Sequence, residues 1–175
     1  MPSKTRPSYP MGQIMDDYRV QAGTRLKVVQ RASGLTQNDL AAVLGITRHT
    51  VSALCRGEQG MAIKYLVPLA VALKVSPAYL AAASEQEAKL ANKVPYEITE
   101  AALLLHAGAS CRAARISANI SIVSLAEEIG IHRTYLSFFE NAKRPISLPL
   151  MAALASKLRS ALYQWLETRV SNPGR

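Results

Sequence analysis

The chain contains one sequence pattern twice, at a shift of about 85 residues. The segment from Ile120 to Ser137 aligns without a gap with the segment from Leu35 to Ser52. Leu-Ala, Gly-Ile and Arg recur in step, so that Gly130 stands where the first copy has Gly45. A duplicated domain explains this agreement better than chance, and two units of one fold are therefore predicted.

The repeated pattern predicts two short helices joined by a turn. In the first copy, the hydroxyl of Thr36 can accept a hydrogen bond from a free amide in the opening turn of the first helix. Gly45 can adopt a positive φ and lets the chain reverse, after which Thr47 can cap the second helix. The inner faces of the two helices are supplied by Leu40, Ala41, Leu44, Val51 and Leu54.

The remaining side chains of the second helix are mostly small, polar or cationic. They are Arg48, His49, Ser52, Ala53 and Arg56. Such groups suit the major groove, where they can meet base edges and phosphates. The stretch is therefore interpreted as a helix-turn-helix whose second helix reads DNA.

These residues resemble the Cro/phage-repressor type of helix-turn-helix, often called the Xre family. The resemblance rests on Leu35-Thr36-Gln37, Leu40-Ala41, Leu44-Gly45-Ile46, Val51-Ser52, Leu54, Arg56-Gly57, Leu69-Ala70, Leu73 and Val75–Leu80. It implies an all-α fold with two tandem five-helix lambda-repressor-like helix-turn-helix domains.

The resemblance also implies DNA contacts in the first copy. Gln37 would contact a phosphate or a base, and Arg56 would lie near a phosphate. The DNA backbone and the bases would be contacted by Thr36, Thr47, Arg48, His49 and Ser52. A solvated surface role is the alternative for each residue.

The second copy resembles the same family through Leu136-Ser137, Phe139-Glu140-Asn141 and Lys143-Arg144-Pro145. The family usually pairs an Arg with a Glu where the first copy has Gln30 and Cys55, and the second copy has Arg115 and Glu140 at these positions. We expect Arg115 and Glu140 to meet and to fix the second helix of the motif. The DNA contacts predicted here are His132, Arg133, Thr134, Ser137, Lys143 and Arg144.

Other positions of the second copy have changed. Ile122 stands in the position of Gln37 and removes a phosphate donor, and Phe138 stands in the position of Ala53. An exposed Phe can contact a thymine methyl group, but it also marks protein contacts or packing. These changes keep open a second hypothesis, an antitoxin-like or protein-interaction module whose second domain binds a partner protein or mediates dimerisation.

Composition and motifs narrow the function classes. The 175 residues carry a net charge of +9, which favours a polyanionic partner such as nucleic acid. Cys55 and Cys111 lie far apart, with no His at ligand spacing, so neither a disulfide nor a metal site is expected. We find no phosphate-binding loop, no HExxH and no Ser/His/Asp arrangement, and expect neither catalysis nor a cofactor.

The predicted organisation is a flexible basic arm (1–12), a first domain (13–91), a second domain (96–170) and a flexible tail (171–175). Gly23 is a candidate weak point of the first long helix, and Pro68 is expected in the first turn of a later helix or at a kink. With no apolar run of about 20 residues and no apolar leader, we expect a cytoplasmic protein, nucleoid-associated when bound to DNA, without membrane or small-molecule partners.

The predicted function is a sequence-specific double-stranded DNA-binding regulator of transcription, a repressor at operator DNA, in a phage, plasmid or other mobile element. The two units could act as a pseudo-dimer within one chain, as parts of a homodimer, or with one unit on DNA and the other in self-association. We favour the homodimer, with the fifth helix and Tyr163, Trp165 and Leu166 as its interface. Packing within the domain is the alternative for this aromatic cluster.

Overall fold

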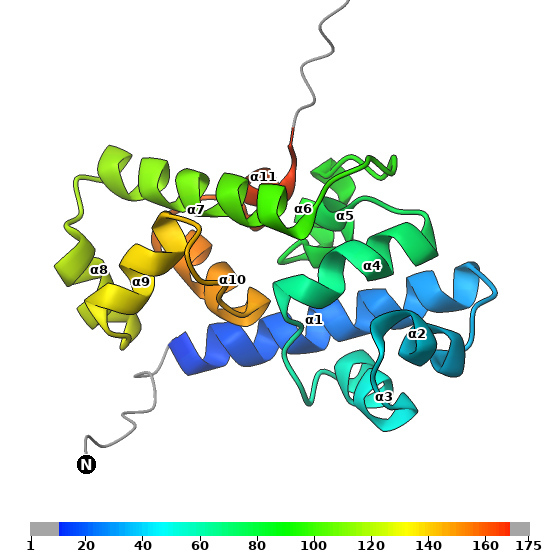
Figure 1. Ribbon diagram of the computed structural model, residues 1–175. Helices are drawn as coiled ribbons and strands as arrows, with labels where there is room; N and C mark the ends of the chain where they lie inside the picture. Colours follow the sequence, from blue (N-terminus) through cyan, green and yellow to red (C-terminus); the bar gives the residue numbers. More distant parts are fainter. Residues whose placement is uncertain (1–10, 169–175) are drawn as a thin grey trace, which may run out of the picture.

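The computed structural model describes residues 11–168, which fold into helices joined by short loops (Figure 1). The first unit contains α1 (Met11–Ala32), α2 (Gln37–Leu44), α3 (Arg48–Arg56), α4 (Ile63–Leu73), α5 (Pro77–Ala81) and α6 (Glu85–Leu90). The second unit contains α7 (Glu100–Ser117), α8 (Ile122–Ile129), α9 (Arg133–Glu140), α10 (Leu148–Lys157) and α11 (Leu162–Leu166). Residues 11–168 include no strand, and the predicted all-α class is confirmed.

The backbone of the second unit follows that of the first at every left-handed residue. Among the described residues, positive φ occurs in four pairs, each separated by 85 positions: Gly34 and Asn119, Gly45 and Gly130, Gly57 and Ala142, Lys74 and Arg159. Ala142 keeps a φ of +55° although its Cβ disfavours that conformation by about 1–2 kcal/mol. The duplicated fold therefore survives where glycine has been replaced.

The start of α2 is capped as the sequence predicts. The amide of Asp39 donates to Thr36 Oγ1 (3.2 Å), and the amide of Thr36 donates to Asp39 Oδ2 (2.7 Å), which completes a capping box. The hydroxyl of Thr36 also donates to this carboxylate, and these hydrogen bonds lower the pKa of Asp39 below its ordinary value. In the second unit the amide of Ser124 donates to Ser121 Oγ at 3.0 Å.

Gly23 is a contact point inside the continuous helix α1, and its role as a weak point of that helix stays a prediction. A Cβ on Gly23 would lie 2.4 Å from the carbonyl oxygen of Leu54 near the end of α3. The equivalent Gly108 in α7 would bring a Cβ within 2.3 Å of the carbonyl oxygen of Phe139 in α9. Both glycines therefore allow the end of a short helix to approach the long helix of its own unit.

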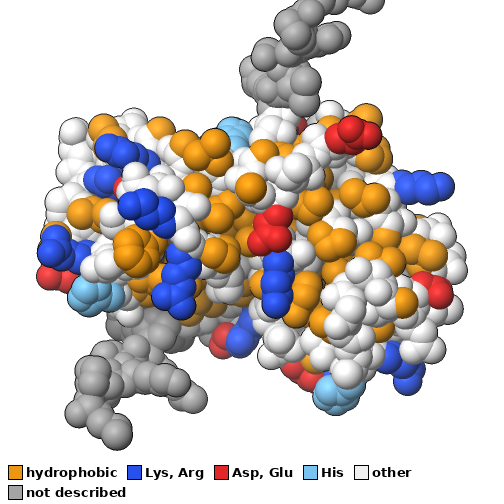
Figure 2. Space-filling model, viewed as in Figure 1, with side chains coloured by type: hydrophobic (Ala, Val, Ile, Leu, Met, Phe, Trp, Pro, Cys, Tyr) orange, Lys and Arg blue, Asp and Glu red, His pale blue; other side chains and the backbone are white. Residues whose placement is uncertain are grey.

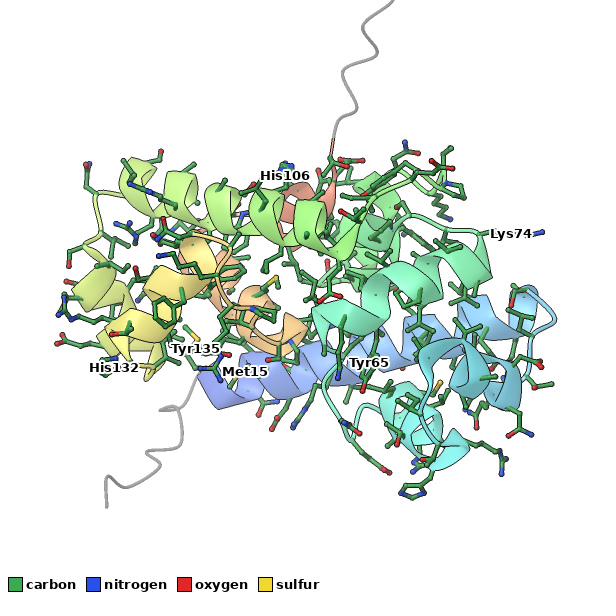
Figure 3. The ribbon with its side chains drawn as sticks, viewed as in Figure 1. Met15, Tyr65, Lys74, His106, His132 and Tyr135 are labelled. Atoms are coloured by element: carbon green, nitrogen blue, oxygen red, sulfur yellow. The ribbon has the colours of Figure 1, made fainter. Side chains whose placement is uncertain are left out.

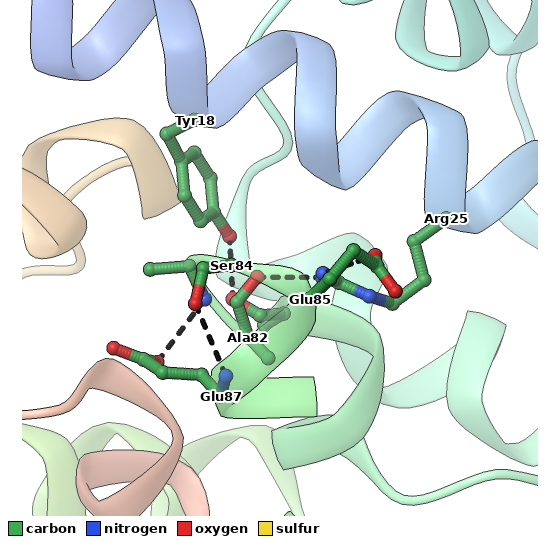
Figure 4. Close-up of polar contacts among 8 residues, drawn as sticks. Tyr18, Arg25, Ala82, Ser84, Glu85 and Glu87 are labelled. Atoms are coloured by element: carbon green, nitrogen blue, oxygen red, sulfur yellow. Dashed lines mark hydrogen bonds and ion pairs between the residues drawn. The ribbon is translucent and has the colours of Figure 1, made fainter. Parts of the chain in front are cut away.

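Two buried polar side chains of α1 hold the chain that leaves α5 (Figure 4). The hydroxyl of Tyr18 donates to the carbonyl of Ala81 at 3.0 Å, and burial raises the pKa of Tyr18. The guanidinium of Arg25 donates to the carbonyl of Ala82 (2.5 Å) and to Glu85 Oε1 (3.0 Å). These contacts tie the last turn of α5 and the start of α6 to α1.

The two units pack on each other through corresponding parts of the repeat. α5 lies against α11, α1 lies against α10, and α4 lies against α7. Ala62 and Ser147, which precede α4 and α10, form an antiparallel bridge in which the amide of Leu148 donates to the carbonyl of Met61 at 3.1 Å. α11, which the sequence predicts as part of a dimer interface, instead packs against other helices of the same chain, among them α5. Its side chains Trp165 and Leu166 are buried there.

Three details differ from the sequence-based expectation. α1 begins at Met11, so residues 11 and 12 belong to it, whereas the rest of the predicted arm and the whole predicted tail (171–175) lie outside the described residues. The first unit has a sixth helix, α6, beyond the five expected, and Ser84 caps it by accepting from the amide of Glu87 at 3.0 Å. Pro68 lies in the middle of α4, so its expected place in the first turn is wrong, whereas a kink at Pro68 stays a prediction.

We predict that Gly108→Ala lowers the free energy of unfolding by about 1–3 kcal/mol, measured by urea titration. Alanine favours a helix by about 1 kcal/mol, but here its Cβ would overlap a backbone oxygen. Ala113→Gly, at an exposed position of the same helix, is the control and isolates helix propensity. A Gly108→Ala protein that is as stable as the parent would contradict the close contact.

Candidate nucleic-acid interface

The outer face of α3 is formed by side chains at helical spacing. Arg48, His49 and Arg56 are exposed, and Ser52 is half-buried, whereas Val51 is buried. Ala53, expected on this face, is only 8% exposed and belongs to the inner face. Thr47 is the N-cap of α3, and its Oγ1 accepts from the amide of Thr50 at 3.2 Å.

Three cationic side chains gather beside this face. Lys27, Arg31 and Arg48 line an open pocket of about 510 Å³ between the end of α1 and the starts of α2 and α3. Thr36 and Gln37 line the same pocket, so the structure brings together three residues that the sequence predicts as DNA contacts. The motif alone did not include Lys27 and Arg31, although their spacing of four residues on a helix places both on one face.

Arg56 is already engaged within the chain. Its guanidinium makes two hydrogen bonds with the carboxylate of Glu58, at 2.6 and 2.8 Å, and another with the hydroxyl of Ser52. The ion pair lowers the pKa of Glu58. Because both side chains are exposed, salt screens this ion pair, and Arg56 can exchange Glu58 for another anion.

The outer face of α9 resembles that of α3 in position but differs in chemistry. Arg133 and Thr134 are exposed, Ser137 is half-buried, and Phe138 is 39% exposed. His132 takes the N-cap place of Thr47, with Nδ1 accepting from the amide of Thr134 at 3.2 Å. Figure 3 shows His132 close to Tyr135 at the start of α9.

The loop after α9 supplies the two predicted phosphate ligands of the second unit. Lys143 and Arg144 are exposed, and the guanidinium of Arg144 lies 5.6 Å from the ring centroid of Tyr135. In the view of Figure 2, several Lys and Arg side chains lie over the part of the molecule that contains the second unit. Ile122, at the start of α8, packs against the core and offers no hydrogen-bond donor in the position of Gln37.

The expected ion pair of the second unit is present. Arg115 Nε and Nη2 donate to the two carboxylate oxygens of Glu140 at 2.7 and 2.8 Å, and Nη1 donates to the carbonyl of Ile120 at 3.1 Å. In the first unit Gln30 donates to the carbonyl of Leu35, which is the equivalent of Ile120. The two copies therefore fix the end of the long helix differently: the first keeps only the backbone contact, and the second adds an ion pair.

Residues 11–168 contain no group of three or more His, Cys, Asp or Glu side chains that could hold a metal ion. Within the same range, no helix combines the length and apolarity needed to cross a membrane. Cys55 and Cys111 are buried free thiols, and burial raises the pKa of both.

Two family models match the chain. A model described as a helix-turn-helix domain matches residues 21–83, and one described as helix-turn-helix matches residues 112–165. One match falls within each structural unit, and together they include the short helices α2, α3, α8 and α9. No curated protein and no solved structure matches the chain.

We predict that Glu140→Gln lowers the free energy of unfolding by about 3–5 kcal/mol, because it leaves the poorly exposed guanidinium of Arg115 without its counter-charge. The double variant Arg115→Gln, Glu140→Cys copies Gln30 and Cys55 of the first unit and should recover most of this loss.

Glu128→Gln is the control for this measurement by urea titration. It breaks the exposed Lys157–Glu128 ion pair and should cost less than about 1 kcal/mol. Equal losses for Glu140→Gln and Glu128→Gln would show that the buried pair does not fix α9.

Proposed function

The chain belongs to the helix-turn-helix proteins and carries two such domains of the Xre/Cro type in tandem, and from this premise we propose that it is a sequence-specific regulator of transcription. Helix-turn-helix domains bind double-stranded DNA through the second helix of the motif. The observation that carries the proposal is the outer face of α3, where exposed Arg48 and His49 lie next to a cationic pocket.

In the proposed complex, α3 enters the major groove as a recognition helix. Arg48, His49 and Ser52 meet base edges, and an Arg can donate two hydrogen bonds to one guanine. Thr36, Gln37, Thr47 and the flanking cations Lys27 and Arg31 meet the phosphates, which fixes the register of the helix without reading sequence. Arg56 joins them when it exchanges Glu58 for a phosphate.

In the second unit α9 is the proposed recognition helix. Arg133, Thr134 and Ser137 reach the bases, and His132, Lys143 and Arg144 reach the phosphates. The proposed outcome is repression by occupancy at an operator of a mobile element, with no catalytic step. The homodimer predicted from the sequence stays a prediction, which the stoichiometry measured below decides.

A protein-interaction role of the second unit is the other candidate. It is favoured by Phe138, which is 39% exposed on the outer face of α9, and by Ile122, which replaces the polar Gln37. An apolar side chain of this size at a helix surface suits a partner protein as well as a thymine methyl group. DNA binding by variants of each recognition helix separates the two roles.

We predict that Arg48→Ala weakens binding to a selected duplex by about 1–3 kcal/mol and relaxes the preference for one base pair, because the bidentate contact is lost. Lys27→Ala should weaken binding to all duplexes alike and reduce the slope of log affinity against log salt by about 1. Fluorescence anisotropy over a salt series measures both effects.

Lys89→Ala removes the same charge from the surface of α6, away from both recognition helices, and is the control. A chain that does not bind duplex DNA at low salt would refute the proposed function. An Arg133→Ala protein with unchanged affinity, specificity and salt slope would instead assign the second unit to protein interaction.

A further inference from the structure

We propose that one chain binds one asymmetric operator, with α3 and α9 in successive major grooves, so that the chain is its own pseudo-dimer. This inference rests on the proposed function, since it concerns how the two recognition helices are used together. It replaces the pairing of two chains with a pairing of two units, and it specifies the kind of DNA site.

The first observation is the bridge between Ala62 and Ser147. These two residues are 85 positions apart, the shift that relates the two units, so the bridge joins a position to its own equivalent. The bridge is antiparallel, with the amide of Leu148 donating to the carbonyl of Met61 at 3.1 Å. A twofold axis is the operation that brings equivalent positions together in this way.

The second observation is that the helix contacts of α1, α4 and α5 with the second unit are related by the repeat: each contact is matched by the same contact with the two units interchanged. α5 packs on its equivalent α11, while α1 packs on α10 and α7 packs on α4. Both α1 with α10 and α7 with α4 pair a first helix of one unit with a fourth helix of the other. The α1–α10 contact is the larger, and α1 begins one turn earlier than α7 with respect to the repeat. The units are thus related by an approximate twofold axis.

The contact between the units is well buried and includes hydrogen bonds. Leu162, Trp165 and Leu166 of α11 are all at most 2% exposed. The carboxylate of Glu87 in α6 accepts from the amide of Tyr163 at 3.3 Å, and the amide of Asn92 donates to Glu167 Oε1 at 3.1 Å. Such an apolar and hydrogen-bonded contact fixes the units relative to each other.

A twofold axis places the two recognition helices at the same level and at equal distances from it. In Figure 1, α5 and α11 lie together near the top of the view, with α3 at the lower right and α9 at the left. Paired recognition helices of this kind enter major grooves about 34 Å apart on one side of the duplex. One chain therefore carries the pair that other proteins obtain by dimerisation.

The outer faces of the pair define the operator. Arg48 and Arg133 are equivalent, so both half-sites should contain a guanine at the same place. The neighbours differ, because Thr134 replaces His49 and the partly exposed Phe138 replaces the buried Ala53. The expected site is an inverted repeat that is imperfect, with a shared guanine and different flanking bases.

The first experiment selects duplexes from a random library with the whole chain and measures the mass of the complex by native mass spectrometry. The expected result is one 19.0 kDa chain per duplex, on a site with two unlike halves centred about 10 base pairs apart. Arg48→Ala should reduce the preference about tenfold or more in one half only, and Arg133→Ala in the other.

The second experiment locks the two units together. The Cα atoms of a non-hydrogen-bonded antiparallel pair lie about 4.5 Å apart, which a disulfide can span. Oxidised Ala62→Cys, Ser147→Cys protein should remain a monomer and should bind the selected duplex within about twofold of its reduced form. The single variants control for the loss of the Ser147 cap, and the native Cys55 and Cys111 are buried.

The outcomes separate this inference from the proposed function. Two chains on a palindromic duplex, failure of the disulfide to form, or loss of binding on oxidation that reduction restores would overturn the single-chain site while DNA binding stands. Absence of binding to any duplex at low salt would overturn both.

Discussion

The presentation of both recognition helices depends on a close backbone contact. The ends of α3 and α9 lie directly on Gly23 and Gly108, where any side chain would overlap a carbonyl oxygen. This contact is the same in the two units, whereas the Arg115–Glu140 ion pair occurs only in the second. The shape of the backbone therefore sets the orientation that the units share, and the second unit adds a charged contact between α7 and α9.

The same long helix that holds α3 also carries the contact between the units. α1 presents Gly23 to α3, and through Tyr18 and Arg25 it holds the chain that leaves α5, which packs on α11. α1 also packs on α10. A rigid helix with these contacts couples the position of a recognition helix to the position of the other unit, because α1 cannot shift toward one neighbour without disturbing the others.

Features that depend on local sequence could be predicted. The caps at Thr36 and Thr47, the turn at Gly45 and the fold class follow from residue type and spacing, and the family resemblance added the Arg115–Glu140 pair. Features that depend on tertiary contacts could not. The sequence is equally consistent with Trp165 at a dimer interface or in the core of its domain, because hydrophobicity does not say what covers a side chain. The structure buries it. Lys27 and Arg31 lie on α1, outside the motif, and only the fold brings them to Arg48.

The two units differ on the outer faces of α3 and α9, where a pseudo-dimer on an asymmetric operator does not require identical residues. At several buried positions an apolar side chain of one unit corresponds to an apolar side chain of the other, as with Val51 and Leu136 or Leu54 and Phe139. On the outer faces His49 and Thr134 do not match. In a homodimer one substitution changes both half-sites at once, so the preferred sequence changes while the site stays symmetric. When both recognition helices lie in one chain, the residues of each can be substituted independently, while the shared core preserves the spacing of the two helices.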